Sequence, residues 1–283
     1  MPDVLLATGV DHPDLWEDEL VLVEALAGRG LSAGPGVWSD PSVDWAAARI
    51  VLVRSAFDYI RDRDAFCAWA DRVEAATPLH NPARVLRWNS HKSYLRELEA
   101  AGVPIVPTAW VDAGSRTDLA GLLAERSWRD AVVKPAVDNG ARGALRVHAG
   151  DPEKGQSHLD RLLAERDVMI QPFVAATETS GERAMIHIDG RFSHAIRKDQ
   201  MLAGRTFSLA RTPPIVPESQ ELALAAQVLS LIPESPLLYA RVDAVMDGGV
   251  ARLMELEVIE PVLFFTKVPD SAERMAAAIS ARL

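Results

Sequence analysis

Two glutamates stand two positions apart in an otherwise apolar stretch, where Leu253 to Val258 reads Leu-Met-Glu-Leu-Glu-Val. In a β-strand, residues i and i+2 project from the same face, so Glu255 and Glu257 are expected side by side. Neighbouring carboxylates repel each other, and their burial is costly without a cation. Mg²⁺ takes hard oxygen ligands and usually keeps phosphates and waters in the rest of its shell, so this pair indicates a magnesium site.

The strand that carries the two glutamates is expected to form a hairpin, because Asp247-Gly248-Gly249 just before it is a typical hairpin turn. If these three residues form the loop, Arg241 and Asp243 share a face with the glutamates, and Met254 lies on the opposite, apolar face. A two-residue Gly-Gly loop would instead place Asp243 beside Met254. The apolar pattern favours the three-residue loop. A half-exposed strand with a solvated polar face is the alternative to a metal site.

The chain of 283 residues has the composition of a globular protein, with 48% hydrophobic and 25% charged residues. A chain of this length buries about 75% of its unfolded surface and usually divides into two or three subdomains. It has no run of about 18 apolar residues and no signal-peptide pattern, so we expect a cytoplasmic protein without membrane contact. The one cysteine, Cys67, lies in an apolar helical pattern and is expected in the core.

The net charge of −10 argues against a general nucleic-acid-binding protein. The same charge opposes, at long range, the binding of any phosphate-bearing anion. A phosphate site in this chain therefore requires a local concentration of lysine, arginine, backbone N–H groups and metal.

The first 80 residues alternate between strand and helix patterns, which predicts an α/β domain with a parallel sheet over residues 1–85. Strands are expected at Val4–Ala7, Leu31–Trp38 and Arg49–Val53, and a helix over Leu15–Ala27. The turn after the first strand lacks the Gly-x-Gly-x-x-Gly pattern, so no NAD site is indicated.

Three charged residues stand just beyond the expected strands of this domain, where open α/β sheets bind their ligands. Arg54 is placed to hold a substrate carboxylate, and Asp11 and Asp58 are candidates for the other charged groups of a small substrate. For Arg54, a structural ion pair with a nearby acid is an equally good interpretation.

A lysine is expected in the first turn of the next helix. Asn89 or Ser90 is predicted to cap a helix that runs to Ala101, with Leu95 and Leu98 directed inward and Lys92 near its start. The helix dipole disfavours a cation there by a few tenths of a kcal/mol, roughly, and a bound anion would reverse that preference. A solvated lysine is the alternative.

A second lysine, Lys134, stands at the end of a predicted strand and leads into a glycine-containing loop over residues 136–144. Gly140 and Gly143 would let backbone N–H groups approach phosphates. The Gly-Lys-Ser/Thr order of a Walker loop is absent, and an ordinary hairpin with glycines is the alternative.

A further buried strand ends at Gln171-Pro172-Phe173-Val174, where proline requires a strand end or an edge. The backbone leaving such a strand exposes donors and acceptors that match the edge of a planar base, with Phe173 and Val174 as walls. Glu178 follows closely. A hairpin over residues 184–196 then ends in Arg197 and Lys198.

Taken in order, these segments resemble the ATP-grasp superfamily over about residues 85–265. The resemblance implies an α/β N-terminal domain (1–85) followed by an ATP-grasp α+β fold, whose two subdomains (86–170 and 171–283) clasp ATP. The implied ATP-binding residues are Lys92, Lys134, Gly140, Gly143, Gln171, Phe173, Val174 and, for the ribose, Glu178. The implied Mg²⁺ ligands are Asp243, Glu255 and Glu257, where Glu257 replaces the usual Asn of the family; its extra charge suits a second metal ion or tighter binding.

Several shorter segments are similar to the group of ATP-grasp proteins that contains the cycloserine cyclo-ligase, an enzyme that closes O-ureido-D-serine with ATP. The segments are 87–92, Gly181-Glu182-Arg183, 192–198 and 257–261. This resemblance implies a small amino-acid-like substrate and an intramolecular ring closure. The group also contains uncharacterised proteins, so the substrate is not determined by membership.

The reaction that the superfamily resemblance implies joins a carboxylate to an amine through an acyl phosphate. Arg241, Arg197 and Lys198 are candidates for stabilising the transferring phosphoryl group and the developing oxyanion, against the alternative of surface charges. An intermolecular ligase of the glutathione-synthetase kind and a nucleotide-binding protein without turnover are the other functions considered. The sequence leaves open the substrate side chain, its chirality, and the choice between a monomer and a homo-oligomer.

Overall fold

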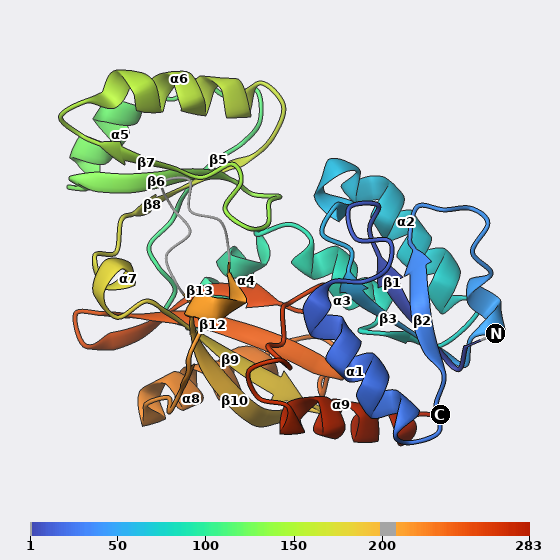
Figure 1. Ribbon diagram of the computed structural model, residues 1–283. Coiled ribbons are helices and arrows are strands. Elements are labelled where there is room, and N and C mark those ends of the chain that lie inside the picture. Colours follow the sequence, from blue (N-terminus) through green and yellow to red (C-terminus); the bar gives the residue numbers. More distant parts are fainter. Residues whose placement is uncertain (1, 199–207) are drawn as a thin grey trace.

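The computed structural model describes residues 2–198 and 208–283, and three β-sheets follow one another along this part of the chain (Figure 1). The first sheet is parallel, and the second and third are antiparallel. In Figure 1 the second sheet lies above the third, and the first lies beside them. The three sheets correspond to the order of units predicted from the sequence, while the exact domain boundaries stay a prediction.

The parallel sheet has the strand order β2-β1-β3-β4, as the alternation of strand and helix predicts. Every residue of β1 and β3 is buried, because helices cover both faces of the sheet. Leu6 packs with α1 on one face, and Val53 packs with α2 on the other. The elements are β1 (Val4–Thr8), α1 (Glu17–Ala27), β2 (Ala33–Val37), β3 (Ile50–Ser55), α2 (Arg63–Glu74) and β4 (Leu79–His80).

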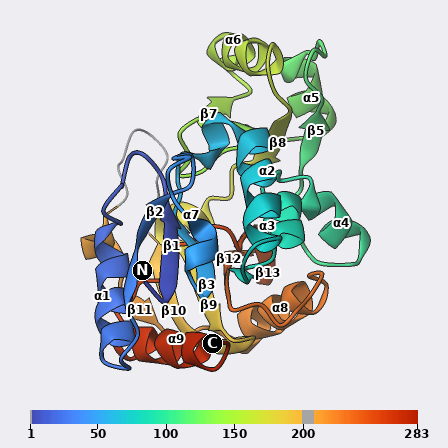
Figure 2. The same cartoon turned by 90° about the vertical axis from the view of Figure 1, so that its right-hand side faces the viewer.

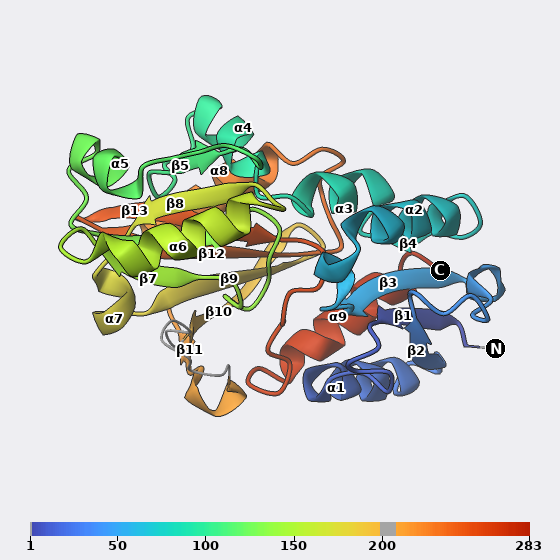
Figure 3. The same ribbon diagram turned by 90° about the horizontal axis from the view of Figure 1, so that it is seen from above.

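The second sheet has the order β5-β8-β6-β7, and α5 and α6 cover its outer face (Figures 1 and 3). Leu119 and Leu123 of α5 and Leu159 of α6 pack on Val133 and Ile170 of the sheet. The other face of the second sheet is not covered by α5 and α6 and is turned toward the third sheet. The elements are β5 (Ala109–Val111), α5 (Leu119–Glu125), β6 (Asp130–Pro135), β7 (Leu145–His148), α6 (Pro152–Leu163) and β8 (Val168–Pro172).

The third sheet has the order β11-β10-β9-β12-β13, with α8 and α9 on the face turned away from the second sheet (Figure 1). Leu224 and Val228 of α8 pack on Val242 and Leu256. The elements are α7 (Ala176–Thr179), β9 (Glu182–Ile188), β10 (Arg191–Lys198), β11 (Pro214–Ile215), α8 (Ser219–Ser230), β12 (Tyr239–Asp247), β13 (Val250–Glu257) and α9 (Asp270–Ser280).

The last helix returns to the first domain, where α9 packs against α1 (Figure 2). Met275 and Ile279 of α9 share one apolar core with Leu22 and Leu26 of α1, and Ile186 of β9 belongs to the same core. The first domain and the third sheet are therefore held together by common packing. No helix within residues 2–198 and 208–283 is long and apolar enough to cross a membrane.

The single helix predicted from Asn89 or Ser90 to Ala101 is wrong at its start. The chain forms α3 (Ala83–Asn89), then a turn, then α4 (Tyr94–Ala100). Lys92 lies in that turn and not in the first turn of a helix.

The physical reason is a long-range contact of the expected cap. The Asn89 side chain donates from Nδ2 to the Leu256 carbonyl (2.8 Å) and accepts from the Val258 N–H (3.2 Å). The asparagine therefore clamps β13 to the helix pair and cannot cap α4. Leu95 and Leu98 are buried, as predicted.

The predicted three-residue loop of the last hairpin is also wrong. Asp247 pairs with Val250, so only Gly248 and Gly249 form the loop, and both have positive φ values (58° and 83°) that favour glycine. A two-residue loop alone would turn the glutamates of β13 away from Asp243.

A β-bulge restores the arrangement that the sequence pattern favoured. Asp243 pairs with Glu255, but the next residue of β12 pairs with Leu253, which leaves Met254 as the extra residue of the bulge. Arg241 lies opposite Glu257. The charged residues of the two strands therefore share one face after all, and Met254 joins them on it instead of the apolar face.

Candidate active site

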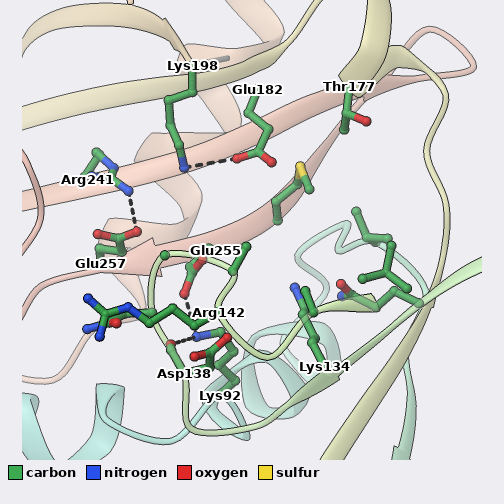
Figure 4. Close-up of a pocket in the computed structure, with 18 of the residues that line it drawn as sticks. Lys92, Lys134, Asp138, Arg142, Thr177, Glu182, Lys198, Arg241, Glu255 and Glu257 are labelled. Atoms are coloured by element: carbon green, nitrogen blue, oxygen red, sulfur yellow. Dashed lines mark hydrogen bonds and ion pairs between the residues drawn. The ribbon is translucent and has the colours of Figure 1, made fainter. Parts of the chain in front are cut away.

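A cavity of about 390 Å³ lies between the second and third sheets, with part of its wall contributed by the first domain (Figure 4). Besides the exposed Arg142, four buried or half-buried cationic side chains from separate elements reach it, and so do two carboxylates of β13. The cations are Lys92 before α4, Lys134 on β6, Lys198 on β10 and Arg241 on β12; the carboxylates are Glu255 and Glu257. The tertiary structure thus gathers residues that are far apart in the sequence.

The two lysines from the second-sheet side differ in their partners. Lys92 Nζ lies 2.7 Å from Glu255 Oε1 and donates to the Asp138 carbonyl at 2.6 Å. Lys134 forms no ion pair within the described residues. Burial and the nearby charge of Lys92 lower the pKa of Lys134, even though Glu255 opposes that shift. An uncompensated cation facing a cavity indicates an anionic ligand.

On the other wall, Asp243 holds two of the cations in place. It is fully buried, accepts from Arg241 Nε and Nη2 at 2.9 Å each, and lies 2.5 Å from Lys198 Nζ. Burial alone would raise the pKa of Asp243, but Arg241 and Lys198 outweigh it and hold the pKa below its ordinary value. Asp243 is not among the described residues that line the cavity, so the structure gives it a positioning role, and its role as a metal ligand stays a prediction.

Glu255 and Glu257 present a different electrostatic balance. Burial would raise the pKa of Glu255, but Lys92 and Lys134 hold it below the ordinary value. Burial raises the pKa of Glu257 to about 7, with Glu255 and Asp243 adding to the shift against its ion-pair partner Arg241. The protein partners of Glu257 therefore do not fully stabilise its charged form.

This donor set fits Mg²⁺ in the way that phosphate-binding enzymes usually hold it, with one or two carboxylates and the remaining positions left to phosphates and water. Within the described residues, no group of three His, Cys, Asp or Glu side chains is placed to hold a metal ion by itself. Glu255 and Glu257 both line the cavity and stay the predicted carboxylate ligands, with phosphates and water in the remaining positions.

The glycine-containing loop folds over Lys92 at the edge of the cavity (Figure 4). Gly140 has φ of 62° and lines the cavity, as a phosphate cradle requires. Gly143 serves packing instead: a side chain there would meet Pro135 at 2.7 Å, and its N–H donates to Asp138 Oδ2 at 3.1 Å. Arg142 of the same loop also lines the cavity and is exposed.

The predicted base-binding segment lines the cavity, with Gln171, Phe173 and Val174. The Gln171 side chain is fixed by donation to Thr108 Oγ1 at 2.9 Å. The Phe173 ring is covered by the Arg146 guanidinium, 3.5 Å from the ring centre, and the Phe173 N–H already donates to Asp130 at 2.8 Å. The backbone donor of Phe173 is therefore not available to a base.

Glu178, predicted to bind ribose, points elsewhere. It pairs with Arg146 at 2.8 Å and is not among the described residues that line the cavity. Glu182, at the start of β9, lines the cavity and lies 3.0 Å from Lys198. Of these two glutamates, Glu182 is therefore the one that faces the cavity, and its segment, Gly181-Glu182-Arg183, was singled out from the sequence only for a resemblance.

Arg197, predicted beside Lys198 as a catalytic cation, faces the other way. Successive residues of a strand point to opposite faces, and here Lys198 is buried at the cavity while Arg197 is exposed. The pair of adjacent charges in the sequence could contribute only one residue to the site.

The three predicted substrate-binding residues of the first domain are not brought together. Asp11 pairs with Arg61, and Asp58 accepts from the Trp38 indole at 2.8 Å and from the Val10 N–H at 3.0 Å. None of the three is among the described residues that line the cavity. The first domain contributes His12, Trp16 and Phe57 to the cavity instead, and none of them belongs to a recognisable sequence motif.

Arg54 forms a structural ion pair with a buried acid, which is the alternative that the sequence left open. It is fully buried and donates from Nε and Nη2 to Glu19 at 2.9 and 2.7 Å, and from Nη2 to the Pro261 carbonyl at 2.8 Å. Its guanidinium lies over the Tyr239 ring, 4.8 Å from the centroid. Arg54 therefore joins the first domain to the segment after β13.

Replacing Arg54 by Met is expected to lower the free energy of unfolding by about 3–5 kcal/mol, because Glu19 is left as an uncompensated buried charge. The KM for the amino-acid substrate should stay unchanged. Urea denaturation and initial rates of ADP release measure the two quantities. A tenfold rise in that KM at unchanged stability would return Arg54 to the substrate site.

Replacing Lys134 by Ala is expected to raise the Kd for ATP about 10- to 100-fold, because a charge-assisted hydrogen bond contributes about 1.5–3 kcal/mol. Titration calorimetry measures this affinity. The matched control is Lys154→Ala, at an exposed lysine on α6, which should leave the Kd unchanged. Equal affinities of the two variants would remove Lys134 from the phosphate site.

Comparison with known proteins identifies the family to which this chain is related. A family model of the N-terminal domain of D-cycloserine synthetase DcsG matches residues 4–81. The cycloserine biosynthesis protein DcsG of Streptomyces lavendulae is 34% identical over 279 residues, which cover 93% of this chain and 92% of that protein. The crystal structure of D-cycloserine synthetase DcsG superposes with a TM-score of 0.90 at 32% identity, over 99% of both chains.

More distant structures share the fold. The ATP-grasp ligase PsnB, complexed with a minimal precursor, superposes with a TM-score of 0.68 at 19% identity over the full length of both chains. D-alanine–D-alanine ligase from Bacillus anthracis, complexed with ATP, gives 0.67 at 13% identity, over 100% of this chain and 99% of that one. The fold and the cavity define an ATP-grasp ligase, an enzyme that forms C–N bonds.

Within that superfamily the chain belongs to the D-cycloserine synthetase DcsG family, as 34% identity across 93% of its length shows. The predicted fold class, an α/β domain followed by an ATP-grasp fold, is confirmed. The alternative of a nucleotide-binding protein without turnover is set aside.

Proposed function

We propose that this enzyme uses ATP to activate the carboxylate of an O-ureidoserine-type amino acid and closes it to the ring of cycloserine. The observation that carries the proposal is the convergence of Lys92, Lys134, Lys198 and Arg241 with Glu255 and Glu257 in one cavity. The family relationship to cycloserine biosynthesis supports the substrate class.

The chemistry needs activation because a carboxylate has no good leaving group. Attack of the substrate carboxylate on the γ-phosphorus would form an acyl phosphate and release ADP. The nitrogen bonded to the side-chain oxygen would then attack the acyl carbon, forming the ring C–N bond while inorganic phosphate leaves and the nitrogen loses its proton. The ring nitrogen still carries the carbamoyl group of the ureido side chain. Water would then cleave the bond between that nitrogen and the carbamoyl carbon, releasing carbamic acid (ammonia and CO₂) and leaving cycloserine. Lys198 and Arg241, held by Asp243, are placed to neutralise the phosphoryl oxygens and the developing oxyanion.

Mg²⁺, held by Glu255 and Glu257, would supply further charge neutralisation to the phosphates. The chain's own residues do the rest. Lys134 provides an unpaired cation for the phosphates, and the loop around Gly140 closes over them. Enclosure between two sheets keeps water from hydrolysing the acyl phosphate.

The decisive assay incubates the enzyme with ATP, Mg²⁺ and O-ureido-D-serine or its L-enantiomer. ADP release should depend on one amino acid alone, and hydroxylamine should trap the acyl phosphate as a hydroxamate. Mass spectrometry should show a product lighter than the single substrate.

The same assay tests the intermolecular alternative, which the shared fold with D-alanine–D-alanine ligase keeps in view. That alternative requires ADP release only from a mixture of two amino acids. Its product would have their summed mass less water. Such a result would replace ring closure by joining, with the acyl phosphate unaffected.

A further inference from the structure

One acidic side chain in the cavity is explained neither by the phosphates nor by the metal. Glu260 follows β13, is only 8% exposed and lines the cavity. Its Oε1 accepts a hydrogen bond from Asn139 Nδ2 at 3.2 Å, and it forms no ion pair with any residue of 2–198 or 208–283. A buried carboxylate without a cation is costly. Burial, together with the nearby charge of Glu257, raises the pKa of Glu260 to about 8.

Three cations of the cavity are already paired with other carboxylates and form no ion pair with Glu260. Lys92 is bound to Glu255, Lys198 is bound to Asp243 and Glu182, and Arg241 is bound to Asp243 and Glu257. Each of these pairs has a geometry that a move toward Glu260 would break. Lys134 and Arg142 also line the cavity, and neither forms an ion pair with Glu260 among the described residues. A cationic ligand would therefore stabilise the charged form of Glu260.

Glu260 lies where the first domain meets the cavity. Asn139 Nδ2, which donates to Glu260, also donates to the Phe57 carbonyl at 2.7 Å. The Phe57 ring contacts the rings of His12 and Trp16, with centroids 5.5 and 6.4 Å apart. This part of the cavity thus combines a single carboxylate with an aromatic wall, an environment that suits an organic ammonium group through charge and cation–π attraction.

A metal ion is a poorer occupant. Glu260 does not complete a group of three His, Cys, Asp or Glu side chains that could hold a metal within the described residues. A single carboxylate beside aromatic rings also lacks the several hard oxygen ligands that Mg²⁺ prefers.

We propose that Glu260 binds the α-ammonium group of the amino-acid substrate and so selects amino acids over other carboxylic acids. The inference rests on the proposed function, because it takes the substrate carboxylate to be directed at the phosphates. The ammonium on the adjacent carbon then has to lie apart from Lys198 and Arg241 and beside an acceptor. Among the described residues, Glu260 and Asp138 are the cavity carboxylates without an ion-pair partner, and Asp138 Oδ2 already accepts from the Gly143 N–H at 3.1 Å.

The test compares Glu260→Gln with the wild type on two compounds, O-ureidoserine and its desamino analogue 3-(ureidooxy)propanoate. Gln keeps the hydrogen bond from Asn139 and removes only the charge. The wild type should prefer the amino acid in kcat/KM for ADP release. In the variant that preference should fall about 10- to 100-fold, through the KM of the amino acid, while the KM for ATP stays unchanged.

Glu125→Gln, at an exposed glutamate on α5, is the matched control and should retain the wild-type preference. The proposal is overturned if Glu260→Gln keeps the preference, or if kcat falls equally with both compounds, which would make Glu260 a group acting on the chemical step. A changed Mg²⁺ requirement at an unchanged KM for the amino acid would likewise overturn it.

Calorimetric binding of the two compounds, with a non-hydrolysable ATP analogue present, separates this inference from the proposed function. If the wild type binds O-ureidoserine but releases no ADP, the proposed reaction fails, and a lost binding preference in Glu260→Gln still supports the ammonium site. If the wild type binds both compounds equally, the ammonium site is wrong whatever the reaction.

Discussion

Replacing Glu255 by Gln is expected to abolish nearly all ADP formation while the protein stays folded. Glu255 pairs with Lys92 at 2.7 Å, lines the cavity and is one of the two carboxylates that we propose to hold Mg²⁺. The loss of its charge should cost several kcal/mol of transition-state stabilisation, roughly a thousandfold or more in kcat. ADP release at saturating Mg²⁺ measures the effect.

The fold should survive this change, because the amide has the shape of the carboxylate and Lys92 keeps its bond to the Asp138 carbonyl. The neighbouring backbone is held independently, since the Leu256 N–H donates to the Tyr94 hydroxyl at 2.9 Å. Circular dichroism and thermal unfolding provide the control. Activity within a few-fold of wild type would exclude Glu255 from the metal site.

Replacing Asp243 by Ala is expected to lower the free energy of unfolding strongly, in addition to the activity. In this respect it should differ from Glu255→Gln, which should affect the activity alone. Asp243 is fully buried and is shared by Arg241 and Lys198, so its removal leaves two buried cations with fewer partners. Breaking a buried ion pair by removing one partner typically costs about 3–5 kcal/mol. Urea denaturation should show a loss of this size, whereas Glu255→Gln should show little.

The matched control for Asp243 is Asp247→Ala on the same strand. Asp247 forms a partly exposed ion pair with Arg252 at 3.0 Å, and exposed pairs contribute at most about 1 kcal/mol. If Asp243→Ala is no more destabilising than Asp247→Ala, the buried network does not hold the cavity wall, and Asp243 acts only through the ligand.

The residues whose predicted position agrees with the structure share one property: their signal is local. Glu255 and Glu257 stand at i and i+2 in a strand, Lys134 ends a strand before glycines, and the first domain alternates strand with helix. Each pattern depends on the pleat or on a short turn, and a few neighbouring residues specify it.

The predictions that failed concern partners chosen across long distances. Asn89 was expected to cap a helix, but it binds the backbone of β13. For Arg54 the sequence left the substrate site and a structural ion pair equally open, and Glu19 and the Pro261 carbonyl surround it in the structure. The side-chain chemistry was read correctly in both cases. The hydrogen-bond partners of Asn89 and Arg54 could not be predicted, because other elements of the packed structure supply them.

The hairpin shows how a wrong local register can give the right site. The sequence favoured a three-residue loop because the apolar pattern required the charged residues on one face, and the structure meets that requirement with a two-residue loop and a bulge at Met254. Burial energy determined which face of the hairpin carries the charged residues. A three-residue loop and a two-residue loop with a bulge both give that arrangement, and they differ only in backbone geometry.

The sequence by itself indicated the class of enzyme through its resemblance to the ATP-grasp superfamily. It also placed several cations and carboxylates on their strands and turns, because strand periodicity, turn glycines and charge spacing are encoded by neighbouring residues. Only the tertiary structure decided which charges remain free in the cavity. Arg197 turned outward, Glu178 paired with Arg146, and Glu260 was left without a cation among the described residues. Charge compensation depends on distances between separate elements, and those distances exist only after the sheets have packed together.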